Sequence, residues 1–212
     1  IFLKKDSVGM TLFKILVLGF AGPALFYFST PVQAIDLNPL SLIKGAVEAV
    51  AEDRSSGDIA TDLGIKTEIT AKVIEKMGTD VISLSADVYE QDVMLTGAVK
   101  TKEQKRQAEK LTRTVENVKK IYNEIRIVKP IDKDKGAVEN YVDDTVIESK
   151  ANALLLDAGG VNVTNFRWRS VGGHVYLFGR ALSQAEKEKA TKIVKGIKNV
   201  LSVKNLAKVR AK

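Results

Sequence analysis

The chain has 212 residues, of which 45% are hydrophobic and 28% charged, a globular composition with enough length for one large or two small domains. It contains no cysteine, which excludes disulfides, thiolate metal sites, cysteine nucleophiles and a lipid attached through cysteine. The single histidine, His174, lies in a Gly-Gly-His turn and has no second histidine with which to share a metal ion. Classes of function that depend on cysteine or on several histidines are therefore disfavoured.

The N-terminus has the three-part pattern of a secretory signal peptide. Three lysines precede the apolar run ILVLGFAGPALFYF, and small residues follow it. Val32 and Ala34 fit the small-x-small cleavage rule, so we expect cleavage after Ala34. The alternative is an uncleaved membrane anchor, but the run is shorter than the roughly 20 apolar residues of a spanning helix. Glycine and proline also interrupt it.

The expected mature chain is still basic. Cleavage removes three lysines and one aspartate, so the net charge falls from +7 to +5. In an exported protein, an excess of Lys and Arg favours anionic lipid or anionic polymers as partners over nucleic acid. The absence of cysteine fits a bacterial periplasm. We therefore predict a periplasmic protein, peripheral at the outer membrane, that is not a lipoprotein.

One constant shift along the chain aligns its second half with its first. This repeat shift brings Gly97 onto Gly179 and Asn117 onto Asn199, and it needs no gap. A repeat of this length indicates a duplicated domain, because solenoid units are usually about 20–50 residues long. The predicted organisation is a signal peptide (1–34), an N-terminal segment with a short helix (35–57), a first domain (58–130), a linker (131–139) and a second domain (140–212).

Each copy is predicted to fold as helix, strand, strand, helix, strand. In the first copy, Ile65, Ile69 and Val73 form the apolar stripe of a helix over 58–77. Alternation in DVISLSADV indicates a strand, and EQD turns into a second strand, VMLTGAV. A second helix over 101–116 leads to a third strand, KKIYNEIRIV, which must lie parallel to the second. The fold class is α+β: two tandem two-layer domains, each with a three-stranded mixed sheet covered by two helices on one face.

The motifs of both copies resemble the BON domain. An apolar-x-apolar-x-Gly strand (VMLTG, VYLFG) precedes a helix with a central alanine, Ala108 or Ala190, and then an apolar-x-Asn-Val turn. The segments IYNEIR and DRSSGD are similar to those of dual-BON envelope proteins. The resemblance implies attachment to phospholipid membranes, support of envelope integrity and stress tolerance, and no catalytic residues or cofactor. Lipoprotein members carry a lipid on a cysteine after the signal peptide, and this chain departs from them there.

The glycines and asparagines that recur in both copies have a structural explanation. Each glycine ends a strand at the crossover, where a Cβ would crowd the turn or require an unfavourable φ. The asparagine after the second helix tolerates the left-handed conformation. This structural set comprises Gly97, Asn117, Asn123, Gly179, Asn199 and Asn205.

The two copies differ on the sheet face that the helices leave uncovered. Strand alternation makes this face aromatic and basic in the second copy and mixed in the first, whereas Trp168 points inward to the core. Cations interleaved with rings suit an anionic lipid surface. The candidate lipid-binding or anion-binding residues are Arg167, Arg169, Tyr176, Phe178, Lys204, Lys208 and Arg210, with Tyr141 and Lys150 on the preceding helix as a second candidate. Alternatively, Tyr176 and Phe178 pack against the first domain or a second molecule.

Two other classes of function fit less well. Open sheets with rings and cations also bind RNA, but such sheets have four strands, and a signal peptide takes the chain away from RNA. The carboxylates at 132–134 and 143–144 lie at solvent-facing positions without a pocket, so we expect no enzyme. We predict a non-enzymatic envelope protein whose partners are an anionic phospholipid surface and other envelope proteins, with no nucleic acid, metal or cofactor. The alternative is a periplasmic adaptor or chaperone-like module.

Overall fold

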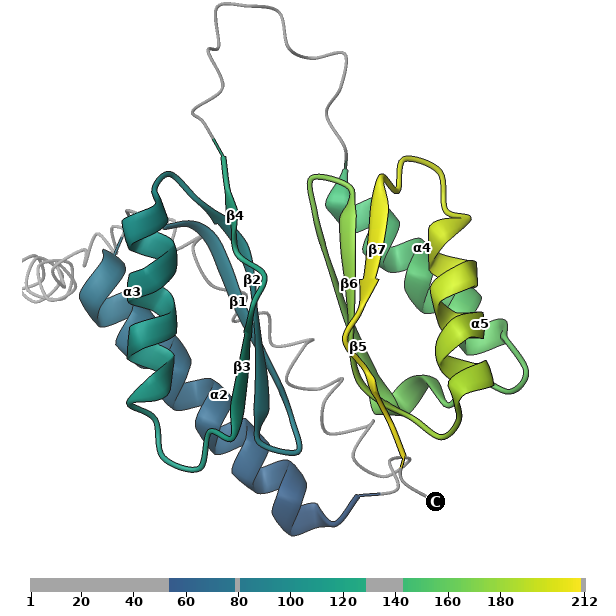
Figure 1. Cartoon of the computed structure of the whole chain (residues 1–212), viewed down its shortest axis with the longest axis horizontal. Helices are drawn as coiled ribbons and strands as arrows, with labels where there is room; N and C mark the ends of the chain where they lie inside the picture. Colours follow the sequence, from purple (N-terminus) through teal and green to yellow (C-terminus); the bar gives the residue numbers. More distant parts are fainter. Residues whose placement is uncertain (1–53, 79–80, 129–142, 211–212) are drawn as a thin grey trace, which may run out of the picture. The chain divides into compact units, whose positions relative to one another are not determined.

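The structure is a computed structural model, and it describes residues 54–78, 81–128 and 143–210 (Figure 1). The predicted signal peptide with its cleavage site, most of segment 35–57, the linker 131–139 and Tyr141 lie outside these residues. None of the helices in the described ranges is both long enough and apolar enough to span a bilayer.

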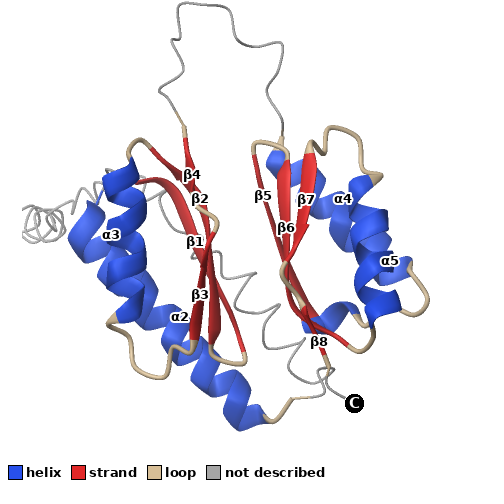
Figure 2. Ribbon diagram, viewed as in Figure 1, coloured by secondary structure: helices blue, strands red, loops and turns tan. Residues whose placement is uncertain are grey.

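The first domain has the predicted order of elements. They are α2 (Ser56–Met77), β1 (Val81–Tyr89), β2 (Asp92–Val99), α3 (Lys102–Arg113), β3 (Lys120–Asn123) and β4 (Arg126–Ile127). Strand β2 is central, antiparallel to β1 and parallel to β3 and β4. Helices α2 and α3 cover one face of this sheet (Figure 2). Between the layers, Ile65, Ile69 and Val73 of α2 are buried in one core with Val93 and Leu95 of β2.

The second domain repeats this arrangement. Its elements are α4 (Asp144–Asp157), the short 3₁₀ helix η3 (Val163–Asn165), β5 (Phe166–Val171), β6 (His174–Ala181), α5 (Gln184–Lys195), β7 (Ser202–Asn205) and β8 (Lys208–Val209). Strand β6 is antiparallel to β5 and parallel to β7 and β8. Phe166 is fully buried, whereas Trp168 is half-buried against the same core and donates from Nε1 to the Glu148 carbonyl at 3.2 Å. The α+β fold with two helices over each sheet is therefore confirmed.

Each α-helix in the described ranges begins at a residue whose side chain accepts a hydrogen bond from its first turn. Ser55, Thr101, Asp143 and Ser183 occupy these positions, and Thr101 forms a full capping box with Gln104. Such caps satisfy amides that have no partner within the helix and typically contribute about 1 kcal/mol each. They fix where each helix starts on its sheet.

The third predicted strand of each domain is two short strands, so each sheet has four strands and not three. Asn123 lies at the break in the first domain. Its Nδ2 donates to the Lys105 carbonyl of α3 at 3.1 Å, and its Oδ1 accepts from the Ile125 amide at 3.4 Å. Asn205 makes the equivalent two bonds in the second domain. The Oδ1 of each asparagine thus accepts a hydrogen bond from a backbone amide at the break between the two strands. Its Nδ2 connects the strand to the second helix.

An aspartate from the first helix holds each β-hairpin turn. Asp62 accepts hydrogen bonds from the amides of Glu90 and Gln91, both at 2.8 Å, where φ is 53° and 64°. Asp144, its equivalent under the repeat shift, accepts from the two amides of the Gly-Gly turn at 2.7 and 2.9 Å. Two central residues with positive φ are typical of the tight turns that match strand twist. The hairpins are therefore fixed to the helix layer through their turns.

Asn117 and Asn199 occupy the turn that follows the second helix of each domain. Both are left-handed, with φ of 63° and 70°. Asparagine adopts this conformation several-fold more often than most residues. The turn directs the chain from the helix layer back to the parallel edge of the sheet.

Gly97 and Gly179 lie inside β2 and β6, and not at the strand end that the sequence analysis expects. Their φ values are 117° and 110°. A Cβ on Gly97 would lie 2.0 Å from the carbonyl oxygen of Ser83, and one on Gly179 would lie 2.1 Å from that of Asn165. The neighbouring strand therefore approaches so closely that no side chain fits.

Substituting either glycine with alanine is expected to lower the free energy of unfolding by roughly 2–6 kcal/mol, because overpacking adds to strain at positive φ. Urea unfolding of Gly97→Ala and Gly179→Ala measures this. Gly64→Ala is the matched control, since a Cβ there has no neighbour within 4 Å in α2. It should stabilise by up to about 1 kcal/mol. Equal stability of the three variants would contradict the close strand approach.

Candidate functional site between the two sheets

The uncovered faces of the two sheets share one apolar cluster. Tyr89 and Met94 of the first domain and Tyr176 and Phe178 of the second are its buried members. The ring of Tyr122 meets that of Phe178 edge to face, with centroids 5.7 Å apart and an interplanar angle of 67°. Val171 and Leu206 complete the cluster. The structure therefore places the two rings of the candidate lipid-binding face against the first domain.

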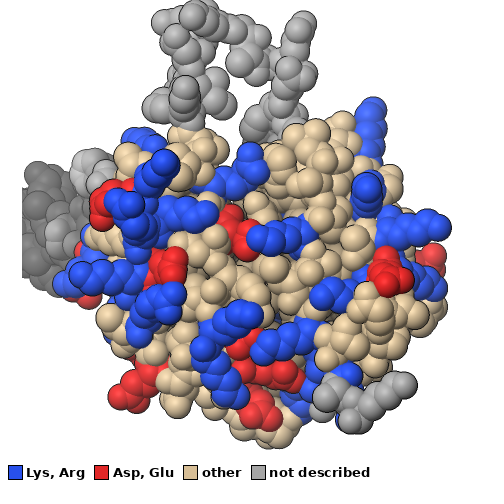
Figure 3. All heavy atoms as spheres, in the orientation of Figure 1, with Lys and Arg blue, Asp and Glu red and all other residues tan. Residues whose placement is uncertain are grey.

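Ion pairs surround this cluster, and in each the carboxylate comes from the first domain and the cation from the second. The four pairs are Asp87–Arg169 (2.8 Å), Glu90–Arg180 (2.6 Å), Asp92–Lys208 (2.6 Å) and Glu124–Lys204 (2.8 Å). Figure 3 shows Lys and Arg side chains interspersed with Asp and Glu on the face turned to the viewer. Three of the predicted lipid-binding cations thus have carboxylate partners within the chain.

The most buried of these pairs joins Asp87 and Arg169. Nε and Nη2 of Arg169 donate to the two carboxylate oxygens at 2.8 and 3.1 Å, and the Asp87 side chain is 6% exposed. Burial acts to raise the pKa of Asp87, but Arg169, Lys66 and Arg167 outweigh it and hold that pKa below its ordinary value. The fork-to-fork geometry is the strong form of an ion pair.

Glu148 of α4 lies on the other side of Arg169, with its Oε2 3.8 Å from Nη1. Its Oε1 accepts a hydrogen bond from the Ser170 amide at 2.8 Å. Burial raises the pKa of Glu148 and the neighbouring carboxylates add to this, whereas Arg169 and the Ser170 amide oppose it; the net shift is upward. The two carboxylates that contact Arg169 therefore have pKa values shifted in opposite directions.

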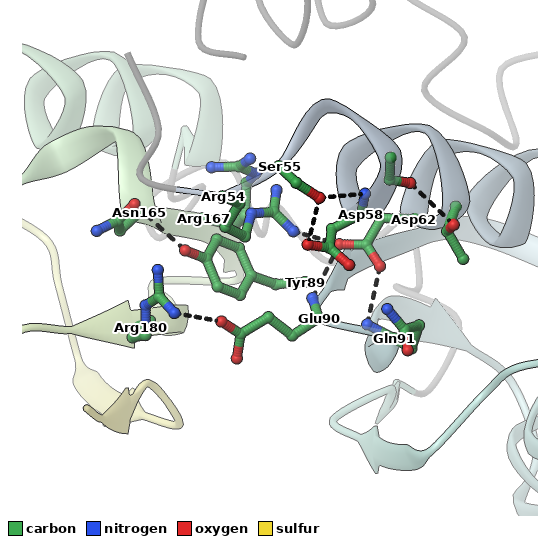
Figure 4. Close-up of polar contacts among 12 residues, drawn as sticks. Arg54, Ser55, Asp58, Asp62, Tyr89, Glu90, Gln91, Asn165, Arg167 and Arg180 are labelled. Carbon is green, nitrogen blue, oxygen red and sulfur yellow. Dashed lines mark hydrogen bonds and ion pairs between the residues drawn. The ribbon is translucent and has the colours of Figure 1, made fainter. Parts of the chain in front are cut away.

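Tyr89 marks one end of the interface (Figure 4). Its hydroxyl donates to Oδ1 of Asn165 at 3.2 Å. The guanidinium carbon of Arg54 lies 3.9 Å from the centre of its ring, and that of Arg167 lies 5.6 Å away. Arg54 also pairs with Asp62, the aspartate that holds the first hairpin. One tyrosine thus joins the start of α2 to the second domain.

A pocket opens beside Tyr89. It is lined by Arg54, Ser55, Asp58, Glu90, Gln91, Lys119, Arg180 and Lys208. Two of its cations, Arg180 and Lys208, already pair with Glu90 and Asp92. The lining therefore has more cations than carboxylates, but these two cations already have carboxylate partners.

Of the remaining candidate residues, Arg167 lies at the edge of this cluster, beside Tyr89, and the others lie apart from it. Nη1 of Arg167 donates to the carbonyls of Thr164 and Phe166 at 2.8 and 3.0 Å. Arg210 is exposed after β8, and Lys150 is exposed on α4, in the helix layer. The structure therefore brings together Arg169, Tyr176, Phe178, Lys204 and Lys208 and leaves Arg210 and Lys150 outside.

His174 is the first residue of β6, directly after the Gly-Gly turn. Its Nδ1 lies 2.7 Å from Oγ of Ser202. Burial and the charge of Arg126 lower the pKa of His174, and Asp144 opposes them. Among the described residues, no three His, Cys, Asp or Glu side chains are grouped to hold a metal ion. The chemistry of this interface is recognition by burial and charge.

Sequence reasoning missed the acidic partners on the first domain. Glu90 and Asp92 belong to the EQD segment, which the sequence predicts only as a turn. One signal was available: the repeat shift places Asp87 opposite Arg169, so equivalent positions carry opposite charges. Such an inversion is typical of two faces that contact each other.

Comparison with known proteins gives one family. A family model described as the BON domain matches residues 61–129 and 143–211. An uncharacterised protein of the gshII 5′ region of Anaplasma centrale is 33% identical over 123 residues, which are 57% of this chain and 79% of that protein. Osmotically-inducible protein Y of Escherichia coli strain K12 is 27% identical over 154 residues, 73% of this chain and 75% of that protein.

Similarity to solved structures is weak. CdsD, a structural protein of the type III secretion system of Chlamydia trachomatis, matches with 15% identity and a TM-score of 0.28. The match covers 70% of this chain and 63% of that one. A similarity at this level carries no argument about fold or function.

Asp87→Asn is expected to lower the free energy of unfolding by about 3 kcal/mol at pH 7, because it removes the carboxylate that holds the half-buried Arg169 by two hydrogen bonds and leaves only the more distant Glu148. The pKa of Asp87 in the folded state is depressed, so its contribution is full above the unfolded pKa of 3.8 and is lost as pH falls through the folded value. Urea unfolding of both proteins between pH 7 and pH 2 measures the difference, which should shrink only in acid.

Glu148→Gln is the control, and its pH dependence should have the opposite sign. The folded pKa of Glu148 is raised, so the wild type loses stability relative to the variant as pH rises from 4.5 through the folded value. A parallel pH dependence of the two variants would contradict the opposed shifts.

Proposed function

Because the chain belongs to the BON domain family, we propose that it is a non-enzymatic envelope protein that associates with anionic phospholipid surfaces and supports outer-membrane integrity under stress. The basic, apolar N-terminus supports export to the periplasm. Similarity to a protein named for induction by osmotic stress supports a role in stress tolerance. The positive charge of the expected mature chain favours an anionic surface.

The observation that carries the membrane part of this proposal is the exposed side of α4. Val146 and Leu154 are 44% and 47% exposed. Val146, Lys150 and Leu154 recur every four residues and so form one stripe along the helix. The adjacent side of the helix is buried in the core through Ile147, Ala151 and Leu155. Large apolar side chains beside a cation suit the boundary between lipid headgroups and acyl chains.

The equivalent stripe of the first domain is polar. The repeat shift maps Val146, Lys150 and Leu154 onto Gly64, Glu68 and Lys72. Glu68 and Lys72 form an ion pair at 3.0 Å. Duplicated helices with the same buried face have therefore diverged on the exposed one. This difference supports membrane contact through the second domain.

Lipid contact through the sheet face would require the two domains to separate. Tyr176 and Phe178 are buried against the first domain, so they reach a membrane only if the two sheets separate. The α4 stripe, which we name by Val146, Lys150 and Leu154, is accessible without such a change. We therefore assign the first lipid contact to the α4 stripe, and we leave the sheet face as a second site that requires opening.

Val146→Glu/Leu154→Glu is expected to reduce binding to anionic vesicles roughly tenfold, since each change replaces an apolar contact by a repelled charge. Flotation with phosphatidylglycerol vesicles measures binding, and phosphatidylcholine vesicles report the contribution of charge. Leu63→Glu on α2, at a residue 48% exposed, is the matched control and should float like the wild type.

Unchanged flotation of the double variant would remove the α4 stripe from the lipid contact. Wild-type protein that floats with neither vesicle would contradict membrane association. It would favour the alternative function, a periplasmic adaptor or chaperone-like module that uses the same stripe for protein partners.

Export predicts a mature N-terminus at Ile35. Periplasmic and membrane fractions of cells that express the full chain, followed by N-terminal sequencing, measure this directly. Protein that retains residues 1–34 and stays in the inner-membrane fraction would show that the leader is an anchor, and protein in the cytoplasm would contradict the proposed setting.

A further inference from the structure

The repeat shift relates the two sides of the interface as well as the two domains. Asp87 and Arg169 are equivalent positions of the duplicated sequence, and they contact each other directly. A residue that meets its own equivalent lies close to a two-fold axis between the two units. The interface is therefore of the self-complementary kind that normally joins identical subunits.

Other contacts follow the same rule. Glu124 pairs with Lys204, and the equivalent positions, Leu206 and Tyr122, pack on the shared apolar cluster. Asp92 pairs with Lys208, and the equivalent positions are His174 and Arg126. After burial, the charge of Arg126 is the next cause that lowers the pKa of His174, so this second pair also interacts. These two contacts thus have counterparts across the axis, with different chemistry on the two sides, whereas Glu90–Arg180 maps onto Gly172 and Ala98 and has no charged counterpart.

Four charges at the centre alternate in sign across the axis. Lys66 lies 3.9 Å from Asp87, Asp87 pairs with Arg169, and Arg169 lies 3.8 Å from Glu148. Lys66 and Glu148 are equivalent positions, just as Asp87 and Arg169 are. The repeat shift therefore maps this charge quartet onto itself with every sign inverted.

This inversion distinguishes the possible pairings. If the first domain met another first domain in this geometry, Asp87 would face a second Asp87 in a buried position. If the second met another second, two Arg169 side chains would face each other. Like charges placed opposite each other at an interface are strongly unfavourable, whereas the mixed pairing gives a continuous alternation.

We propose that the charge quartet permits a first-domain sheet face to pair only with a second-domain sheet face. A second copy of this chain satisfies this rule, because the first domain of each copy can pair with the second domain of the other. Burial of the apolar cluster supplies affinity without selecting the partner. The surrounding pairs Glu90–Arg180, Asp92–Lys208 and Glu124–Lys204 have the same direction of charge. In the wild type the linked domains satisfy each other, because their effective concentration is in the millimolar range.

The test uses two full-length variants, each with one inverted domain. K66E/D87R places an arginine against Arg169, and E148K/R169D places an aspartate against Asp87, so neither chain can satisfy its own interface. In a mixture of the two, each first domain meets a second domain of matching charge on the other chain. Native mass spectrometry and sedimentation at micromolar concentration should show monomers for each variant alone and a one-to-one dimer of twice the mass for the mixture.

Two controls separate the effect of the charge quartet from a general effect of charge. The fourfold variant K66E/D87R/E148K/R169D restores alternation within one chain and should be monomeric, with wild-type hydrogen-exchange protection in β2 and β6. E75R/K76E inverts an exposed pair on α2 and should not dimerise with any variant. A mixture that stays monomeric, a half-inverted variant that dimerises alone, or a fourfold variant that stays open would each overturn the proposal.

Folding of the half-inverted variants is checked by the hydrogen-exchange protection of α3 and α5, which do not contribute to the charge quartet. Where one does not fold, E124K and K204E provide the same test at a more exposed position, since Lys204 is 56% exposed. Each of these should raise exchange in β2 and β6, and E124K/K204E should return it to the wild-type level. Failure of the double variant to do so would also overturn the proposal. The proposal does not depend on membrane binding.

Discussion

The structure depends on mutual burial of the two sheet faces that the helices leave uncovered. A small domain with both helices on one side of its sheet cannot bury the other side by itself. Here that side carries Met94 in the first domain and Tyr176 and Phe178 in the second, and each sheet covers the other's apolar residues. The duplication therefore covers this face, because the second copy supplies the missing layer.

Burial alone does not select a partner, and the charges around the cluster do. The first domain contributes the carboxylates and the second the cations, with the Asp87–Arg169 pair at equivalent positions of the repeat. In this arrangement, most of the cations on the sheet face of the second domain form ion pairs with carboxylates of the first domain. This pairing moves the proposed membrane contact to α4, where Leu154 is 47% exposed and its equivalent in the first domain is Lys72.

Much of the fold could be predicted from the sequence, because apolar periodicity and the repeat report local geometry directly. Ile65, Ile69 and Val73 defined the buried side of α2 before any contact was known. The break between β3 and β4 could not be predicted, since it depends on where the side chain of Asn123 finds a carbonyl on α3. Strand alternation likewise placed Tyr176 on the uncovered face but could not say what covers it, because a partner face is a long-range property.

The central claim is that Asp87 and Arg169 recognise each other across the domain interface, and a double-mutant cycle tests it most directly. The free energies of unfolding of Asp87→Ala, Arg169→Ala and the double variant give the coupling energy of the pair. The account predicts a favourable coupling of at least about 1.5 kcal/mol, as found for close interfacial charge pairs. Additive effects within about 0.5 kcal/mol would mean that the two residues do not meet in solution, and would contradict the pairing of the two sheets.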